Sequence, residues 1–251
     1  MSEGVRTVDR TGPGGTPWQM SRVTEIRRET ERAKTFRLQL SEPVLHVPGQ
    51  HYVLRLTAPD GYTAQRSYSV ASAPDPGGSI ELTVDMLPDG EVSGFLNDVV
   101  EVGDELEVRG PIGGYFVWRA DSPALLIGGG SGVVPFMSML RHARTLGRED
   151  LLRLVVSVRG PEDLFYADEI LGPYTTILTT RSAWPGSDRL PHHIDAEDLL
   201  AALDATEPMP PDDLAIFVCG SNGFADAVTD QLIAGGVGAD RIRVERFGSA
   251  A

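Results

Sequence analysis

Two short segments of the chain hold residue types whose spacing could serve ligand chemistry. The first is Arg66–Ser69, with the sequence Arg-Ser-Tyr-Ser, and the second is the glycine-rich run Gly128–Gly132. A guanidinium can bind a diphosphate through two parallel hydrogen bonds, and a phenol ring can stack on a planar heterocycle. A glycine-rich turn that leads into a helix can bring backbone N–H groups against a phosphate. Together the two segments predict sites for two phosphate-bearing ligands.

The first segment is predicted to lie in a strand. Residues two apart in a strand share a face, so Arg66 and Tyr68 point together, with the Ser69 hydroxyl beside them. Downstream, Gly90–Ser93 opens a predicted helix whose N–H groups and serine hydroxyl suit a phosphate. Because four-residue motifs also match by accident, an ordinary half-buried strand is the alternative.

The glycine run lies between a buried strand predicted at Ala124–Ile127 and a helix predicted to begin near Val133. It is not the standard dinucleotide fingerprint G-x-G-x-x-G, because Val133 occupies the place of the third glycine. A tight strand–helix turn without any ligand is the alternative for this run taken alone.

Short strands are predicted throughout the first half of the chain. They are expected at Arg22–Arg28, Thr35–Leu40, Tyr52–Thr57, Gln65–Ala71, Ile80–Met86 and Glu105–Arg109. Turn signals rich in proline and glycine separate them, and one short helix fits at Ser93–Val99. Many short strands at this spacing predict a small antiparallel β-barrel.

From Pro123 onward, strands alternate with helices. Strands are expected at Ala124–Ile127, Arg153–Val158, Thr175–Thr179, Leu214–Val218 and Arg241–Glu245, and helices at Val133–Thr145, Asp163–Ile170, Ala196–Leu203 and Asn222–Ala234. This alternation predicts an α/β domain with a parallel sheet and helices on both faces. We therefore divide the chain into a flexible tail (1–17), a β-barrel domain (18–119) and an α/β nucleotide-binding domain (120–251).

Composition limits the class of protein. The net charge of −14 over 251 residues argues against nucleic acid as a partner. The single cysteine, Cys219, excludes an intramolecular disulfide and a cluster held by four thiolates of this chain. The sequence has neither an apolar run of membrane-spanning length nor the pattern of a signal peptide, so we expect no membrane insertion and a cytoplasmic location. His192 and His193 with Asp195 are interpreted as a loop, and no metal site is predicted.

Several segments, taken in order, resemble those of the ferredoxin–NADP reductase superfamily. They are Pro48–Gln50, Arg66–Ser69, Gly90–Ser93, Gly110–Gly113, Gly128–Pro135, Cys219–Ser221 and the terminal Glu245–Phe247. Each motif is weak singly, but this order is specific. Ser131 occupies a position where the superfamily commonly has a threonine, and serine retains the side-chain hydroxyl.

The resemblance implies an FAD site in the barrel domain. Arg66 and Ser93 would hold the FAD diphosphate, Tyr68 would stack on the flavin ring and Ser69 would contact flavin N5. The implied FAD-binding residues are Arg66, Ser67, Tyr68, Ser69, Gly90, Val92, Ser93 and Phe247. Phe247 would cover the flavin face that the nicotinamide must reach.

The resemblance also implies an NADP site in the α/β domain. Its residues would be Gly130, Ser131, Gly132, Ser157, Arg159, Arg181, Arg189, Cys219 and Gly220. Arginines after the second and third strands of such a sheet suit the 2′-phosphate of NADPH, whereas NAD enzymes usually place a carboxylate there. NADPH is therefore favoured over NADH, although surface arginines are common in this chain.

Three residues are implied to act at the reacting atoms: Ser69, Cys219 and Glu245. Cys219 would position the nicotinamide rather than act as a nucleophile, and Glu245 would tune flavin N5 or protonate near it. The implied function is an FAD-dependent NADPH reductase that passes electrons to a separate acceptor, a ferredoxin or an oxygenase component.

Two alternatives remain open. One is a free-flavin reductase or diaphorase that uses NAD(P)H without a protein partner. The other is a non-catalytic nucleotide-binding subunit, against which the intact Arg66–Ser69 segment speaks. A basic stretch between Arg22 and Arg37 could dock an acidic ferredoxin, and a solvated strand face is the favoured interpretation of it.

Overall fold

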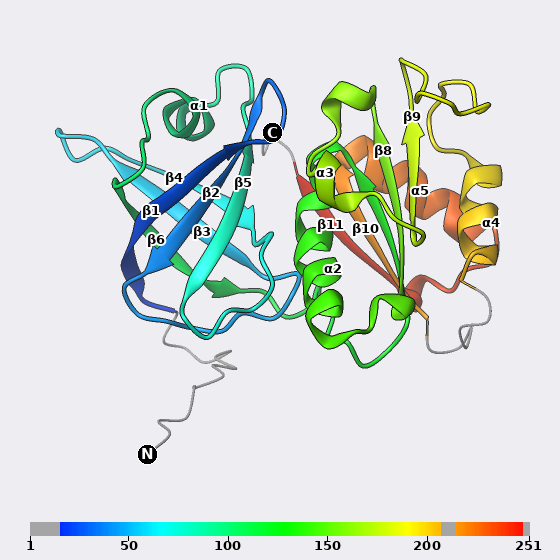
Figure 1. Ribbon diagram of the computed structural model, residues 1–251, viewed down its shortest axis with the longest axis horizontal. Helices are drawn as coiled ribbons and strands as arrows, with labels where there is room; N and C mark the ends of the chain where they lie inside the picture. Colours follow the sequence, from blue (N-terminus) through cyan, green and yellow to red (C-terminus); the bar gives the residue numbers. More distant parts are fainter. Residues whose placement is uncertain (1–15, 207–213, 248–251) are drawn as a thin grey trace. The chain divides into compact units, whose positions relative to one another are not determined.

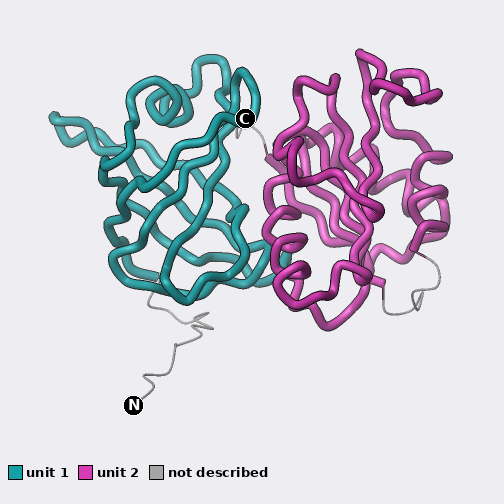
Figure 2. Tube along the Cα trace, viewed as in Figure 1, with its two compact units in different colours: residues 1–117 teal, residues 118–251 magenta. Residues whose placement is uncertain are grey.

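The structure is a computed structural model that describes residues 16–206 and 214–247. The chain divides into two compact units, residues 1–117 and 118–251 (Figure 2). This division falls two residues before the one that the sequence suggests. The expected tail at residues 1–17 lies largely outside the described residues, and the first strand begins at Trp18.

The first unit is built on a six-stranded antiparallel sheet in the order β4-β3-β6-β1-β2-β5 (Figure 1). Its strands are β1 Trp18–Arg28, β2 Ala33–Leu40, β3 His51–Thr57, β4 Thr63–Ser69, β5 Ser79–Asp85 and β6 Glu105–Ile112. A single bridge between Val70 and Leu82 joins the two edge strands. The sheet is thereby closed into the predicted small barrel, and this prediction is confirmed.

The alternation of side chains along the strands forms the barrel core. In β2, Phe36, Leu38 and Leu40 are buried while Arg37 and Gln39 are exposed, which is the period of two of a strand with one buried face. Helix α1, Glu91–Asp98, contacts both β4 and β5, the two strands that share only one bridge. The part of β4 that carries Arg66 and Tyr68 therefore has a strand partner on one side only.

The second unit is built on a five-stranded parallel sheet in the order β11-β10-β7-β8-β9. Its strands are β7 Ala124–Gly129, β8 Leu152–Val158, β9 Thr175–Thr179, β10 Ala215–Ser221 and β11 Ile242–Phe247, and its α-helices are α2 Val134–Leu146, α3 Ala167–Ile170, α4 Ala196–Asp204 and α5 Asn222–Ala234. Short 3₁₀ turns lie at Gly130–Val133, Glu149–Leu151, Pro161–Asp163 and Ala239–Arg241. The chain builds outward from β7 in one direction and then returns to add β10 on its other side. Such a reversal opens a ligand crevice at the carboxyl ends of the two central strands.

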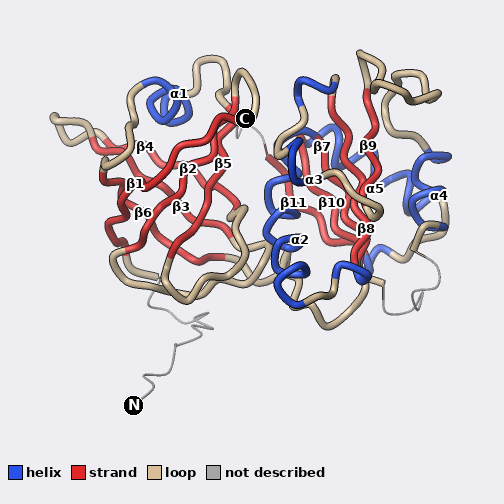
Figure 3. Tube along the Cα trace, viewed as in Figure 1, coloured by secondary structure: helices blue, strands red, loops and turns tan. Residues whose placement is uncertain are grey.

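Helices cover both faces of this sheet (Figure 3). On one face, Ile127, Ile216 and Val218 pack with Leu199 of α4 and Val228 of α5. On the other, a Cβ atom at Gly128 would lie 3.2 Å from the ring of Phe136 in α2. The predicted α/β architecture with a parallel sheet is confirmed.

One predicted helix is wrong. Asp163–Ile170 is not a continuous helix, because the 3₁₀ turn ends at Asp163 and α3 begins only at Ala167. Leu164, which follows the 3₁₀ turn, has an extended backbone with φ −78° and ψ 116°. Tyr166 also has a positive φ of 57°, which interrupts the helical path.

Among the helices of the described residues, none combines the length and the apolar character needed to cross a membrane.

Candidate functional site

Strand β4 presents Arg66 and Tyr68 on its inner face. Their cross-strand partners in β3 are Leu54 and Tyr52, both members of the barrel core. Tyr68 packs against that core, whereas Arg66 is exposed. Burial raises the pKa of Tyr68 to about 12, and the Arg66 charge opposes part of that rise. The phenol is therefore a neutral hydrogen-bond donor at any ordinary pH, and its ring is held by the core.

Ser69, at the end of β4, has the least satisfied side chain of the segment. It is 3 % exposed, and its hydroxyl has no hydrogen-bond partner among the described residues. Buried hydroxyls are normally paired, because an unpaired one costs about 1–3 kcal/mol. An unpaired buried hydroxyl next to Tyr68 fits a flavin ring that carries a hydrogen-bonding atom at its edge. The residues of β4 thus fit the FAD that the sequence implies.

The sequence did not single out His51, which the strand register brings opposite Ser69. Directly opposed residues of antiparallel strands share a face, so the half-buried imidazole lies beside the unpaired hydroxyl. Its Nδ1 is 3.6 Å from where a Cβ of Gly113 would stand. Burial lowers the pKa of His51, which favours a neutral ring. The signal was present, because His51 directly follows the quoted Pro48–Gln50 segment.

The start of helix α1 uses the residues expected to bind phosphate. The Ser93 hydroxyl donates to the Gly90 carbonyl and accepts from the Leu87 N–H, each at 3.3 Å. Val92 is 1 % exposed and packs in the barrel core, so only its backbone can meet a ligand. Among the described residues, no side chain makes a capping hydrogen bond at the N-terminus of α1. Ser67, the remaining predicted residue of β4, is exposed. The phosphate-binding roles of Gly90 and Ser93 stay predictions.

The glycine run turns tightly onto the end of β10. A Cβ at Gly132 would lie 2.1 Å from the Cys219 carbonyl oxygen, and one at Gly129 would lie 2.7 Å from the Phe224 ring. Gly130 differs from both, because its φ is +54° and a Cβ there would meet no atom within 4 Å. Two glycines therefore let the turn pack against protein, and Gly130 leaves an open backbone position at the crevice between β7 and β10.

Cys219 and Glu245 are register partners on the neighbouring strands β10 and β11. Cys219 is fully buried, and burial together with the nearby Glu245 raises the pKa of its thiol well above the usual value. The thiol therefore stays protonated, which agrees with a positioning role rather than a nucleophilic one. Burial also raises the pKa of Glu245 from 4.5 to about 7, and its Oε2 has no hydrogen-bond partner among the described residues.

Two neighbouring residues complete this end of the sheet. Gly220 allows the Phe224 ring to pack closely, since a Cβ there would lie 2.6 Å from it. Phe247, the last residue of β11, is half-buried and pairs with Ser221.

Ser157, Arg159 and Arg181 gather at the carboxyl ends of β8 and β9. Ser157 is 7 % exposed, whereas both arginines are exposed and no ion-pair partner of either is found in the described part of the chain. The Arg181 N–H donates to the Arg159 carbonyl at 2.8 Å, so the two loops run together here. Two unpaired guanidiniums on adjoining loops suit a phosphate monoester.

Arg189, which the sequence predicts as a ligand of the 2′-phosphate, is ion-paired within its own loop region. Its guanidinium donates to both carboxylate oxygens of Asp198, at 3.0 and 2.7 Å, and to the Thr179 carbonyl at 3.0 Å. It also contacts the His192 carbonyl at 3.2 Å. Asp198 already balances the charge of Arg189, so this guanidinium attracts a phosphate less strongly than an unpaired one. Its role as a ligand of the 2′-phosphate stays a prediction.

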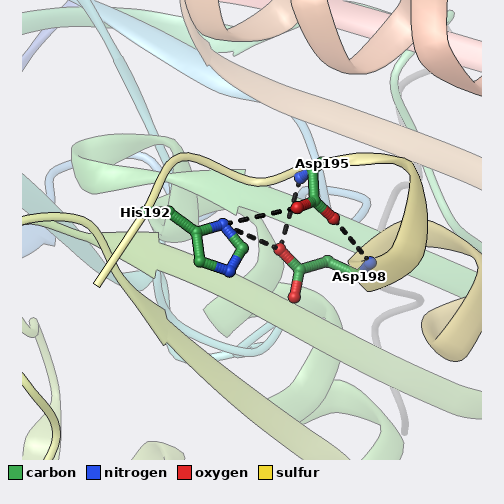
Figure 4. A group of neighbouring side chains, drawn as sticks. All are labelled: His192, Asp195 and Asp198. Atoms are coloured by element: carbon green, nitrogen blue, oxygen red, sulfur yellow. Dashed lines mark hydrogen bonds and ion pairs between the residues drawn. The ribbon is translucent and has the colours of Figure 1, made fainter. Parts of the chain in front are cut away.

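A third polar residue joins His192 and Asp195, where the sequence offered none (Figure 4). His192 Nδ1 lies 3.5 Å from Asp195 and 3.9 Å from Asp198. The Asp195 carboxylate, however, accepts hydrogen bonds from the Glu197 and Asp198 N–H groups, and the Asp198 carboxylate accepts one from the Asp195 N–H. These carboxylates form the capping box of helix α4, and Asp198 also binds Arg189. The cluster is accounted for as a helix cap.

Both units match known domain families. Residues 19–117 match the oxidoreductase FAD-binding domain, and residues 126–230 match the oxidoreductase NAD-binding domain. The chain belongs to the ferredoxin–NADP reductase superfamily. It therefore carries one domain for FAD and one for a pyridine nucleotide.

Relatives within this superfamily include reductase components. The chain is 32% identical over 248 residues to the reductase component of propane 2-monooxygenase from Rhodococcus jostii (strain RHA1), covering 95% of this chain and 66% of that protein. It is 34% identical over 238 residues to the glycine betaine monooxygenase reductase subunit from Chromohalobacter salexigens, covering 91% of this chain and 64% of that protein. The chain thus spans just under two thirds of the length of these relatives.

The fold has solved counterparts in the superfamily. A ferredoxin NADP+ reductase from Neisseria gonorrhoeae, solved with FAD and NADP, superposes with a TM-score of 0.77 at 22% identity. The match covers 91% of this chain and 98% of that one. At this identity the likeness establishes the two-unit fold alone.

Proposed function

We propose that this protein is an FAD-dependent NADPH reductase that passes electrons to a separate acceptor, an oxygenase component. The observation that carries the proposal is that one chain joins an FAD-binding and a pyridine-nucleotide-binding domain of the superfamily. It is supported by relatives that are reductase components of monooxygenases. The location proposed with it is the cytoplasm.

Bound FAD supplies the redox chemistry, accepting a hydride and releasing electrons one at a time. The chain would bind and orient it with the residues of β4. Arg66 would neutralise the diphosphate, the core-held Tyr68 ring would stack on the flavin, and the unpaired Ser69 hydroxyl would bond its edge. His51 is added to this set, because it flanks Ser69 on the same face.

The α/β unit would bind NADPH at the carboxyl edge of its sheet. The Gly130–Gly132 turn would receive the diphosphate, and Ser157, Arg159 and Arg181 would receive the 2′-phosphate. NADPH is preferred in this proposal because Arg159 and Arg181 have no ion-pair partner among the described residues. Glu245 would hold a proton near neutral pH, and Cys219 would fill the space beside it.

The charge on the barrel supports an oxygenase component over an acidic ferredoxin as acceptor. Three arginines of β1 and β2 that could have formed a basic docking patch, Arg22, Arg27 and Arg37, are ion-paired instead. Arg27 binds Glu29 at 3.0 Å, and Arg37 binds Glu81 at 2.6 Å. With their charges matched and a net charge of −14, these strands offer little attraction to an acidic carrier.

An anaerobic visible spectrum of the purified protein tests the proposal. We expect flavin absorbance bands that bleach on addition of NADPH and far less readily with NADH. Equal or better bleaching with NADH would keep the reductase and overturn the nucleotide preference. A protein that stays colourless after incubation with FAD would overturn the proposal and leave a non-catalytic nucleotide-binding subunit.

Steady-state turnover distinguishes the proposed reductase from a free-flavin reductase. A reductase with a protein partner is saturated by that partner and turns over free FMN slowly. Fast turnover with free FMN, and no saturation by any carrier protein, would instead identify a free-flavin reductase.

A further inference from the structure

The loop between β9 and α4, residues 180–195, is held by a clamp centred on Arg189. The Arg189 guanidinium binds Asp198 in the first turn of α4 through two hydrogen bonds, and it binds the Thr179 carbonyl at the end of β9. The side chains of the pair are only 19% and 13% exposed. A bidentate, largely buried ion pair is geometrically specific, so it restricts the conformation of the loop.

The clamp closes the loop onto the strand from which it leaves. The His192 N–H donates to the Thr179 carbonyl at 3.1 Å, the same oxygen that Arg189 binds. Figure 4 shows His192 drawn toward Asp195 and Asp198 at the start of α4. The returning end of the loop is therefore tied to both β9 and α4.

The departing end of the same loop carries Arg181. Its backbone N–H, together with that of Ser182, donates to the Arg159 carbonyl, at 2.8 and 3.1 Å. The exposed side chains of Arg159 and Arg181 are therefore carried by two backbone segments that are hydrogen-bonded to each other. Because, among the described residues, Arg181 is joined to Arg159 only through this one backbone carbonyl, the path of the 180–195 loop decides whether the two residues stay adjacent.

We propose that Arg189 is a positioning residue for nucleotide selectivity: its clamp to Asp198 and Thr179 fixes the 180–195 loop so that Arg181 remains beside Arg159 to receive the 2′-phosphate. This inference rests on the proposed NADPH preference. It assigns Arg189 an indirect role, through the loop, in place of direct phosphate binding.

The test measures kcat and KM of the FAD-loaded enzyme with NADPH and with NADH. Arg181→Gln is expected to raise the KM for NADPH about tenfold with little effect on NADH, because it removes a charge-assisted bond. Arg189→Gln is expected to raise the KM for NADPH by about three- to tenfold with kcat unchanged, since ground-state binding alone is weakened. Arg189→Lys should restore part of the loss, because it keeps the charge but not the bidentate geometry.

Asp198→Asn distinguishes positioning from direct binding. If Arg189 bound the phosphate itself, release from Asp198 would leave or lower the KM for NADPH. The clamp predicts the opposite sign, a KM raised as in Arg189→Gln. In the Arg181→Gln background, Arg189→Gln should add almost nothing, whereas independent ligands would multiply their effects.

Arg153→Gln is the matched control. Arg153 also binds backbone carbonyls, at Ala205 and Asp150, but it lies at the start of β8, away from the nucleotide edge. It should change thermal stability without changing the ratio of the two KM values. Thermal unfolding of every variant, read beside the kinetics, separates a misfolded protein from a selective loss, and Asp198→Asn carries the test if Arg189→Gln does not fold.

The outcomes are separable. If Arg159→Gln and Arg181→Gln leave the ratio of the KM for NADPH to the KM for NADH unchanged, the proposed nucleotide preference fails. If those two variants raise the ratio of the KM for NADPH to the KM for NADH while Arg189→Gln and Asp198→Asn do not, the preference stands and the clamp inference is overturned.

Discussion

Ser69 and Glu245 each bury an oxygen without a hydrogen-bond partner among the described residues, one in each unit. Folding alone does not favour such atoms, because each has given up water without a replacement. Both lie in segments that the sequence assigned to chemistry. Replacing Ser69 should therefore change stability and ligand binding in opposite directions, and replacing Glu245 should change how stability depends on pH.

Ser69→Ala should make the FAD-free protein more stable by about 1 kcal/mol, because it removes an unpaired buried hydroxyl. The same change should weaken FAD binding about fivefold, since a hydrogen bond of about 1 kcal/mol to the flavin is lost. Urea unfolding and fluorescence titration with FAD measure the two effects.

Thr63→Ala is the control, because Thr63 is exposed on the same face of β4 and is not among the predicted FAD-binding residues. It should alter neither quantity appreciably. A loss of stability in Ser69→Ala would contradict this account, since it would mean that the hydroxyl is already satisfied in the apoprotein.

Glu245 should make stability depend on pH between 4.5 and 7. Its pKa is about 7 in the folded protein and 4.5 is its usual value, so the native state binds the proton more tightly. The free energy of unfolding should therefore fall by up to about 3 kcal/mol as pH rises through this window. Glu245→Gln should remove that decline relative to wild type, as measured by urea unfolding at pH 5 and pH 8. Parallel pH profiles for the two proteins would show that the carboxyl is not perturbed.

At the scale of elements, the decisive feature is how closely the β7–α2 turn approaches β10. Gly132 lies directly against the Cys219 carbonyl, and Phe224 of α5 fills the space over Gly129 and Gly220. The turn, the strand and the helix therefore form one packed corner. The close packing is possible because the glycines carry no side chain, and it leaves no space for an added Cβ atom.

Gly132→Ala should destabilise the protein by at least about 2 kcal/mol, because the added Cβ would overlap backbone that cannot move aside. Nucleotide binding should weaken with it, since the turn must shift away from β10. Gly172→Ala, where a Cβ would meet nothing within 4 Å, is the matched control and should be nearly neutral. Thermal unfolding and NADPH titration of both variants provide the comparison, and equal behaviour would refute the close approach.

At the scale of the whole molecule, charge is the property that a diffusing acceptor meets first. The net charge is −14, and Arg22, Arg27 and Arg37 of β1 and β2 are ion-paired with glutamates. A surface of this kind repels anions at long range and attracts cations.

Reduction of the anionic acceptor ferricyanide should therefore accelerate with ionic strength, whereas reduction of a cationic acceptor such as hexaammineruthenium(III) should slow. The screening length shortens from about 30 Å at 0.01 M salt to about 10 Å at 0.1 M, so this range captures the effect. Stopped-flow rates at both salt concentrations test it. Rates that move in the same direction for both acceptors would show that net charge does not govern encounter.

The sequence by itself determined the elements and the ligand classes. Period-two alternation around Arg66–Ser69, the glycine run after a buried strand, and strand–helix alternation from Pro123 depend on neighbours within a few residues. Local sterics and hydrogen bonding act over that same range, so these features could be predicted. The predicted helix at Asp163–Ile170 was wrong because Leu164 is extended and Tyr166 has a positive φ, and a helical side-chain pattern does not reveal such a backbone break.

Only the tertiary structure decided which side chains are free to act. The β3–β4 register placed His51 beside Ser69. The path of the 180–195 loop gave Arg189 the partner Asp198, whereas Arg181 has no ion-pair partner in the described part of the chain. Residue type shows that an arginine can bind phosphate, but its availability depends on where the chain brings a carboxylate. That placement is set by loop paths and strand registers, which no local pattern encodes, because they result from the packing of the folded chain as a whole.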